Sequence, residues 1–176
     1  GIIRKLREYS PQQTIFRAWC PGCATGEEAF SIAILVRECL EECNLYNHVR
    51  IQIYATDIGN EGIEFARKGR YPKNIAADVS EARLKRWFVD EGDSYVVCKE
   101  IRESVIFAVQ NIISDPPFTR LDLICCRNLL IYFTTGLQKK IFPLFYYALL
   151  PHGILFVGTS ESLTNDSKLF STLDAK

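Results

Sequence analysis

The segment from Thr14 to Asp57 places the strongest constraint on the fold, because strand and helix patterns alternate along it in a fixed order. Thr14–Cys20 is β-branched and aromatic and stops at Pro21-Gly22, as expected of a buried strand. A helix with one apolar face follows from Gly26 to about residue 43, and a second strand, Val49–Thr56, ends at Asp57. Together they form one βαβ unit, which implies a parallel sheet with right-handed crossovers.

The remainder of the chain continues this alternation with one interruption. Asn60 is expected to cap a helix that Gly69 closes, and Ser80 to cap a helix that ends near Phe88. Short strand patterns then predict a small antiparallel insertion over about 88–110, with strands at 88–89, 95–98 and 105–109. The α/β pattern resumes with a strand at 121–126, a helix at 137–150, a turn at 151–153 and a strand at 154–157. We predict one α/β domain over residues 1–176, with a mostly parallel sheet flanked by helices.

Charge and composition exclude several classes of function. The 176 residues include 21 basic and 21 acidic side chains, so the chain lacks the basic stripe of a nucleic-acid-binding protein. No apolar run approaches the roughly 18–20 residues that span a bilayer, and the opening GIIRKLREYSPQQ is unlike a signal peptide. Seven scattered cysteines fit a reducing compartment, so we expect a cytoplasmic protein.

Polar residues at the predicted strand ends suggest a cofactor site. In open parallel sheets ligands bind beyond the carboxyl ends of the strands, where the loop 20–28, Asp57 and Arg127-Asn128 would meet. Asp57 is placed to accept hydrogen bonds from ribose hydroxyls, and glycines in the loop let a ligand approach the backbone. Glu27 and Glu28 would repel a pyrophosphate but suit the positive charges of S-adenosylmethionine. Alternatively, both acids only complement the helix dipole.

The CxxC spacing of Cys20 and Cys23 raises the possibilities of a metal site and of a redox pair. A four-thiolate zinc site would need Cys39 and Cys43 as well, but these lie within the predicted helix. Structural zinc sites favour paired ligands in loops. We therefore expect no metal, and interpret the stretch as a cofactor loop whose glycines and glutamates matter more than its thiols.

Six motifs together resemble one protein family: CPGCATGEEAFSIAI, ATDI, ARKGRYP, AVQNI, CRNLLIYF and HGILFVGTSESL. In this order, from about Phe16 to Leu163, they are similar to the CheR-type chemotaxis methyltransferases, most of all to CheR modules of CheB–CheR fusion proteins. The resemblance implies a Rossmann-like class I S-adenosylmethionine-dependent methyltransferase fold. It also implies methylation of glutamate side chains on chemoreceptor helices, with glutamate methyl esters and S-adenosylhomocysteine as products.

The resemblance assigns site residues by position. Its implied cofactor-binding residues are Gly22 and Ala24 in the loop, Glu28 at the methionine moiety, Asp57 at the ribose, Asn111 and Ile112 beside the adenine, and Cys126 and Arg127 at the end of a strand. Tyr132 matches a tyrosine close to the transferred methyl group. Because a glutamate carboxylate is ionised and nucleophilic at pH 7, no strong base is needed, and Arg127 and Tyr132 are the candidates for steering it. Alternatively, Tyr132 is a core aromatic residue.

The chain also departs from the family pattern. It begins just before the first strand, so the usual N-terminal helical domain and an arginine near the active site are missing, and the final strand of the family sheet would follow Lys176. We therefore expect cofactor binding by this chain, but methyl transfer only with the missing segment. The turn VDEGDS is shorter than in members that dock a receptor pentapeptide, so no such tether is expected.

Two other functions compete with this interpretation. A CheR-like module within a longer chain, beside CheB-like or PAS-like domains, could bind S-adenosylmethionine or a partner without catalysis. The tetrapeptide Asp115–Phe118, DPPF, also matches the signature of methyltransferases that act on amino groups. In those enzymes the signature directly follows the fourth strand, whereas here it precedes the strand at 121–126, so N-methylation is the less favoured alternative.

Overall fold

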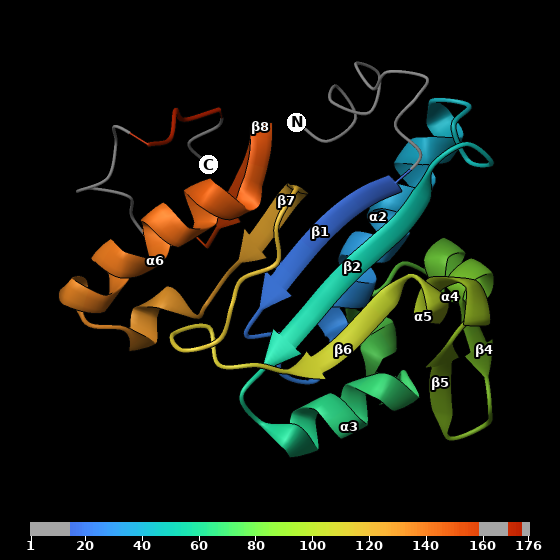
Figure 1. The fold of residues 1–176 in the computed structure, drawn as a ribbon. Helices are drawn as coiled ribbons and strands as arrows, with labels where there is room; N and C mark the ends of the chain where they lie inside the picture. Colours follow the sequence, from blue (N-terminus) through green and yellow to red (C-terminus); the bar gives the residue numbers. More distant parts are fainter. Residues whose placement is uncertain (1–14, 159–168, 174–176) are drawn as a thin grey trace.

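A five-stranded parallel sheet organises the computed structural model, which describes residues 15–158 and 169–173. In spatial order its strands are β6 (Val105–Val109), β2 (Arg50–Asp57), β1 (Ile15–Pro21), β7 (Leu121–Cys126) and β8 (Leu149–Val157). Every neighbouring pair runs parallel, so the carboxyl ends of the strands lie along one edge (Figure 1). The predicted parallel α/β architecture is confirmed.

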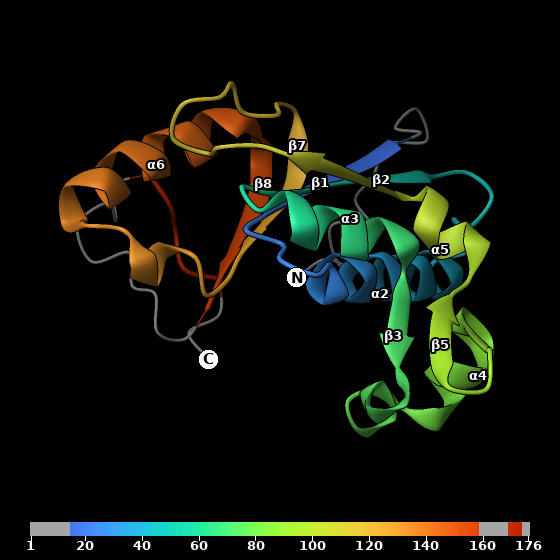
Figure 2. The same ribbon diagram turned by 90° about the horizontal axis from the view of Figure 1, so that it is seen from below.

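Helices cover both faces of this sheet. α2 (Glu27–Glu42) and α3 (Asn60–Lys68) lie on one face, and α6 (Thr135–Ala148) lies on the other (Figure 2). Side chains of β1 alternate between the two cores: Phe16 and Ala18 pack on the α2 side, whereas Trp19 packs on the α6 side. Among the described residues, no helix has both the length and the apolar character needed to cross a bilayer.

A second, antiparallel sheet projects from the α2 side, and its extent differs from our prediction. Its strands, in the order β3-β5-β4, are Arg70–Pro72, Ser94–Val97 and Phe88–Asp90. The short helices η1 (Lys73–Ala77), α4 (Glu81–Trp87) and α5 (Lys99–Glu103) adjoin it along the chain. The assignment of Val105–Val109 to this insertion was wrong, because that segment is β6 and pairs parallel with β2. An apolar run of five residues does not indicate its partner, and the three-residue β3 gives no periodic signal.

Several predicted boundaries differ from the structure by small amounts. Ser80 does cap α4, since its hydroxyl accepts from the backbone N–H of Arg83 at 3.4 Å. Gly59, rather than Asn60, is the residue that precedes α3. The predicted turn at 151–153 lies inside β8, as an irregularity where the register with β7 shifts and His152 has a φ of 67°. The motif HGILFVGTSESL continues beyond the described residues from position 159.

Candidate functional site

Four neighbouring strands bring the predicted site residues to one edge of the main sheet. The loop 22–26 follows β1, Asp57 ends β2, Asn111 follows β6 and Arg127 follows β7. Because these strands are parallel, all four positions lie at the edge toward which the arrowheads of Figure 1 point. β1 lies between β2 and β7, so the edge includes the place where the strand order reverses, and ligands bind at such places in open α/β sheets.

The loop between β1 and α2 has a tight backbone conformation. Gly22 and Gly26 have φ angles of 70° and 90°, and Ala24 between them has 45°. A Cβ atom on Gly26 would lie 2.8 Å from the Cβ of Ala66 and 3.0 Å from the ring of Phe107. The loop is therefore pressed against α3 and β6, while Ala24 remains exposed at its tip. An exposed backbone of this kind can approach a ligand closely.

Asp57 joins the two loops that border the site. Its Oδ2 accepts from the backbone N–H of Ala24, and its Oδ1 accepts from the backbone N–H of Gly59, both at 2.9 Å. The backbone N–H of Cys23 also donates to the carbonyl of Thr56 at 3.0 Å. Each carboxylate oxygen keeps a free lone pair, so the half-exposed Asp57 can still accept from two ligand hydroxyls.

Glu28 and Arg127 form an ion pair beside this loop. Arg127 Nη1 lies 3.1 Å from Glu28 Oε1, although the two residues are far apart in the sequence. The guanidinium also lies 5.7 Å from the ring centre of Phe156. Both side chains are partly exposed, so the pair is weak and its partners can be exchanged. A carboxylate next to a guanidinium suits a ligand end that carries both an ammonium and a carboxylate group.

Asn111 and Ile112 lie next to Asp57 through the chain that leaves β6. The backbone N–H of Gln110 donates to the carbonyl of Asp57 at 2.9 Å. Asn111 then forms a turn: its Oδ1 accepts from the N–H of Ile113 at 3.0 Å, and its own N–H donates to Asp115 Oδ2 at 2.8 Å. Ile112 packs partly against the core on the α6 side. The structure thus brings both residues to the side of the site bordered by Asp57.

The DPPF tetrapeptide has a structural role in this turn. Asp115 closes the turn at Asn111, and Phe118 stacks on Tyr54 with ring centres 4.0 Å apart and an interplanar angle of 12°. The same Phe118 ring meets Trp19 edge-on at 5.6 Å. The motif precedes β7 and packs on the α6 side of the sheet. The position directly after β7, where amino-methyltransferases carry this signature, is instead occupied by Arg127 and Asn128.

Two predicted site residues differ greatly in exposure. Tyr132 ends the short helix η2 (Leu130–Tyr132), and 78% of its surface is accessible. This exposure is incompatible with the alternative that Tyr132 is a core aromatic residue. Cys126, in contrast, is fully buried at the end of β7 in the core on the α6 side. The structure therefore does not bring the Cys126 side chain to the surface of the site.

The thiols near the loop are protonated at neutral pH. Burial, followed by the nearby Asp57 carboxylate, raises the pKa of Cys23 to about 12. Burial is also the main cause that raises the pKa of Cys20 and of Cys125, with Glu28 contributing in both cases. Reactive redox cysteines need a lowered pKa, so these thiols are unsuited to that role. Across the described part of the chain, no three His, Cys, Asp or Glu side chains gather as a metal site.

Tyr71 supports the loop and was missed by the sequence analysis. It lies in β3, is 3% exposed, and its hydroxyl donates to the carbonyl of Thr25 at 2.8 Å. The rings of Phe30 and Phe65 pack edge-on against it. The motif ARKGRYP contains this tyrosine, but a contact across 46 positions leaves no signal in a single sequence.

Replacing Tyr71 with phenylalanine should lower the free energy of unfolding by about 1 kcal/mol, because the Thr25 carbonyl loses its donor while the ring packing stays. For a chain of this size that corresponds to a fall of roughly 2–4 °C in Tm, measured by circular dichroism. Tyr147→Phe is the matched control, since Tyr147 is 73% exposed and should leave Tm unchanged. An equal fall in both variants would contradict a supporting role for the Tyr71 hydroxyl.

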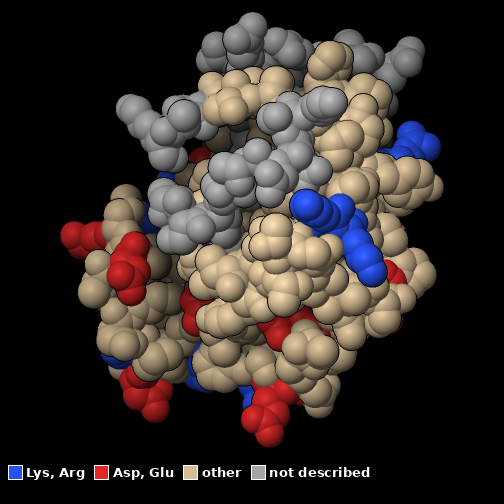
Figure 3. All heavy atoms as spheres, turned by 90° about the vertical axis from the view of Figure 1, so that its left-hand side faces the viewer, with Lys and Arg blue, Asp and Glu red and all other residues tan. Residues whose placement is uncertain are grey.

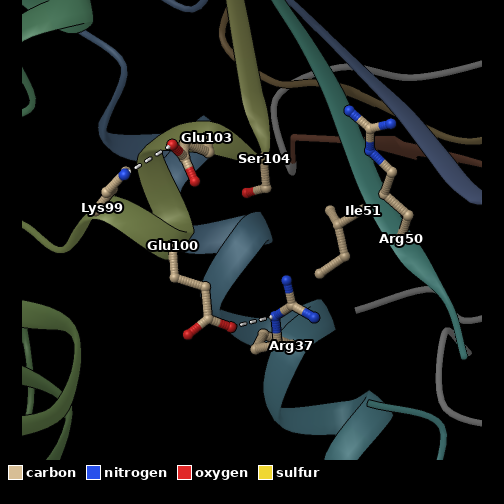
Figure 4. A pocket seen from close by; sticks show the side chains of 7 residues that line it. All are labelled: Arg37, Arg50, Ile51, Lys99, Glu100, Glu103 and Ser104. Carbon is tan, nitrogen blue, oxygen red and sulfur yellow. Dashed lines mark ion pairs between the residues drawn. The ribbon is translucent and has the colours of Figure 1, made fainter. Parts of the chain in front are cut away.

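A hollow elsewhere on the molecule is distinct from this site. It has a volume of about 440 Å³ and lies at the amino ends of β2 and β6, the opposite edge of the sheet. Its charged side chains are largely paired with one another (Figure 4): Arg37 with Glu100 at 2.9 Å, and Lys99 with Glu103 at 3.6 Å. It therefore offers no cluster of polar groups that converge on a ligand.

Comparison with known proteins identifies strong sequence relatives. Residues 2–176 match the family model described as "CheR methyltransferase, SAM binding domain". A 104.1 kDa protein encoded in the hypE 3′ region of Rhodobacter capsulatus is 41% identical over 99% of this chain, which spans 18% of that protein. Chemotaxis protein methyltransferase 2 of Vibrio cholerae is 33% identical over 96% of this chain, which spans 59% of that relative.

Solved structures share the fold at low sequence identity. The glycopeptide N-methyltransferase MtfA complexed with sinefungin has a TM-score of 0.52 and 9% identity, and the match covers 88% of this chain and 47% of that one. The carbon methyltransferase DszA also has a TM-score of 0.52, with 12% identity, over 88% of this chain and 31% of that one. These similarities support the Rossmann-like methyltransferase fold.

Proposed function

The chain belongs to the CheR methyltransferase family, whose matched domain binds S-adenosylmethionine, and from this premise we propose that it methylates glutamate side chains of chemoreceptors. The relatives with this family's name act in chemotaxis, which supports a chemoreceptor as the protein substrate. The observation that carries the proposal is Asp57, which holds both loops at the carboxyl edge of the sheet and keeps acceptor capacity for a ribose.

The residues at this edge fit the cofactor group by group. Asp57 would accept from the two ribose hydroxyls, and Asn111 and Ile112 would flank the adenine. Glu28 would receive the ammonium group of the methionine moiety, and Arg127 its carboxylate, when their ion pair opens. The loop with Gly22 and Ala24 would lie under the bound molecule. Glu28 and Arg127 thus match the two charges of the methionine moiety's amino and carboxyl groups.

Methyl transfer in this site requires positioning and no base. S-adenosylmethionine, when bound, would supply an electrophilic methyl group: the new bond from a glutamate oxygen to the methyl carbon would replace the bond from carbon to sulfur, with S-adenosylhomocysteine as the leaving group. No proton moves, because the substrate carboxylate is already ionised at pH 7. Tyr132, which is exposed on η2 five residues after Arg127, would orient the incoming carboxylate with its hydroxyl. Arg127 would help to hold the substrate carboxylate if its guanidinium contacts that group as well as the cofactor.

The experiment that tests this function measures transfer of labelled methyl groups to a purified receptor cytoplasmic fragment. We expect incorporation that is released as methanol by mild base, because carboxyl methyl esters hydrolyse under conditions that leave N-methyl groups intact. A receptor fragment with glutamine at the accepting positions is the control and should remain unlabelled. Base-stable label would instead favour N-methylation. Cofactor binding without any transfer would favour a non-catalytic module.

Three further observations support proposals about the protein's context. We propose that the domain works within a longer signalling chain, since its Rhodobacter relative is a 104.1 kDa protein and this chain spans only 18% of that relative. All seven cysteines are free thiols, which agrees with a cytoplasmic location. The hairpin between β4 and β5 is short, and the N–H of Glu91 donates to the Ser94 carbonyl at 3.0 Å, so we propose that no receptor pentapeptide is tethered there.

A further inference from the structure

The exposed side of α6 differs from that of other helices in the chain. Apart from Thr135 at its first position, its exposed residues follow helical spacing and form what we call the outer face of α6: Gly136, Lys139, Lys140, Pro143, Tyr146 and Tyr147. Outward positions of a surface helix are usually polar, with charges of both signs. α4 follows that rule, with Glu81 and Lys85 paired on its surface. α6 contains no acidic residue, and Lys139 and Lys140 are its only charged residues.

The outer face of α6 also carries exposed aromatic surface. Tyr147 is 73% exposed and Tyr146 is 56% exposed, and the Tyr146 ring meets Phe170 edge-on at 6.0 Å. Figure 3 views the molecule from this side and shows a compact group of basic side chains beside uncharged surface. Tyrosine is enriched in protein interfaces, and exposed apolar patches often mark them.

The start of α6 is close to the site along the chain, because η2 begins three residues after Arg127. Gln138 Nε2 donates to the carbonyl of Leu130 at 2.9 Å and to that of Phe133 at 3.2 Å, which fixes the start of α6 against η2. η2 carries Ile131, 50% exposed, and Tyr132, 78% exposed. Exposed apolar side chains are therefore present on η2, at the residue proposed to orient the methyl acceptor, and again along α6, whose 14 residues extend for about 21 Å.

We propose that the outer face of α6 docks the helix of the protein substrate that carries the methyl-accepting glutamates. This inference rests on the proposed function. A helix with several glutamates is acidic, so Lys139 and Lys140 would attract it, while the tyrosines and Pro143 would pack on its apolar residues. A helix lying along α6 would present one glutamate to Tyr132 at the end of the surface nearest the site. The two lysines then contribute to substrate affinity and not to cofactor binding.

The first test reverses the charge of both lysines. We expect K139E/K140E to raise the KM for a glutamate-bearing receptor fragment by about 10-fold or more, with kcat and the Kd for S-adenosylmethionine unchanged. The matched control is K85E/K99E, which makes the same change in net charge on α4 and α5, at the far end of the molecule from α6 (Figure 1). It should leave KM unchanged. An equal rise in KM for both variants, or for neither, would overturn the docking proposal.

The second test does not depend on catalysis. A photo-crosslinking amino acid at position 147 should form an adduct with the receptor fragment, and K139E/K140E should reduce its yield. The same amino acid in place of Phe65, which is 38% exposed on α3, should form none. An adduct from position 147 with a receptor fragment that the full-length protein does not methylate would retain the docking surface and reject the proposed function. Absence of the adduct, or binding of anionic lipid vesicles that depends on the two lysines, would reject the docking proposal.

Discussion

Replacing Asp57 with alanine is expected to raise the Kd for S-adenosylmethionine at least about 100-fold, measured by isothermal titration calorimetry. In the proposed site the carboxylate accepts from two ribose hydroxyls, and a hydrogen bond to a charged group is worth roughly 1.5–3 kcal/mol. The variant also releases the Ala24 and Gly59 N–H groups that Asp57 now holds at 2.9 Å, so the two loops lose their common anchor. Both effects weaken the binding of the same ligand.

Two controls separate these effects. Asp57→Asn keeps one side-chain oxygen and the size of the group, so we expect an intermediate loss of affinity. Asp93→Ala removes an exposed acid from the β4–β5 hairpin and should bind as the unmodified protein does. Micromolar affinity retained in folded Asp57→Ala, checked by circular dichroism, would contradict the assignment of Asp57 to the ribose. S-adenosylhomocysteine should respond in the same way, because its ribose is the same.

Replacing Trp19 with alanine should destabilise the chain by about 3–5 kcal/mol, a large part of the total stability of a typical domain. Trp19 is fully buried in β1, and its rings meet Phe118 at 5.6 Å and Phe145 at 5.9 Å. Its Nε1 donates to the Thr56 hydroxyl at 2.9 Å, so the substitution leaves both a cavity and an unsatisfied buried hydroxyl. Urea unfolding followed by circular dichroism measures the change.

The matched comparison is Trp19→Phe, which fills more of the cavity but still removes the donor to Thr56. We expect it to lose less stability than Trp19→Ala. Because Thr56 precedes Asp57 in β2, a shift of Thr56 in either variant should also weaken cofactor binding. A loss below about 1.5 kcal/mol for Trp19→Ala would mean that the core on the α6 side collapses around the cavity, and that Trp19 matters less to this core than its burial suggests.

The parts of the fold that were predictable are those with long, regular patterns. β1, α2 and β2 were placed within one or two residues, because an apolar run ended by Pro-Gly and a helix with one apolar face leave few alternatives. β6 was assigned to the wrong sheet, since its five residues specify burial but not the strand beside them. Its partner is set by the packing of Phe107 against Phe30 of α2, a contact between distant segments.

The candidate site was predictable in outline for a similar reason. Parallel strands gather their carboxyl ends, so the strand pattern alone predicts Asp57 and Arg127 at one edge of the sheet. The ion pair of Arg127 with Glu28 was not expected, because it joins side chains on separate elements that only the folded sheet brings together. The same holds for the hydroxyl of Tyr71 beneath the loop. Contacts between side chains that are far apart in the sequence depend on how the elements pack, and the spacing of residues along a single sequence does not reveal that packing.

The protonated thiols around the cofactor loop affect how readily the protein could be methylated on its own cysteines. A sulfonium methyl donor is an electrophile, and a thiolate is a stronger nucleophile toward it than a carboxylate. Burial and the nearby Asp57 carboxylate raise the pKa of Cys23 to about 12, which keeps this thiol protonated at pH 7. Burial of Cys20 and Cys125 suppresses their ionisation in the same direction. Cysteine side chains next to the proposed cofactor site are therefore held in the form that reacts slowly with a methyl donor, which disfavours alkylation of the protein by its own cofactor.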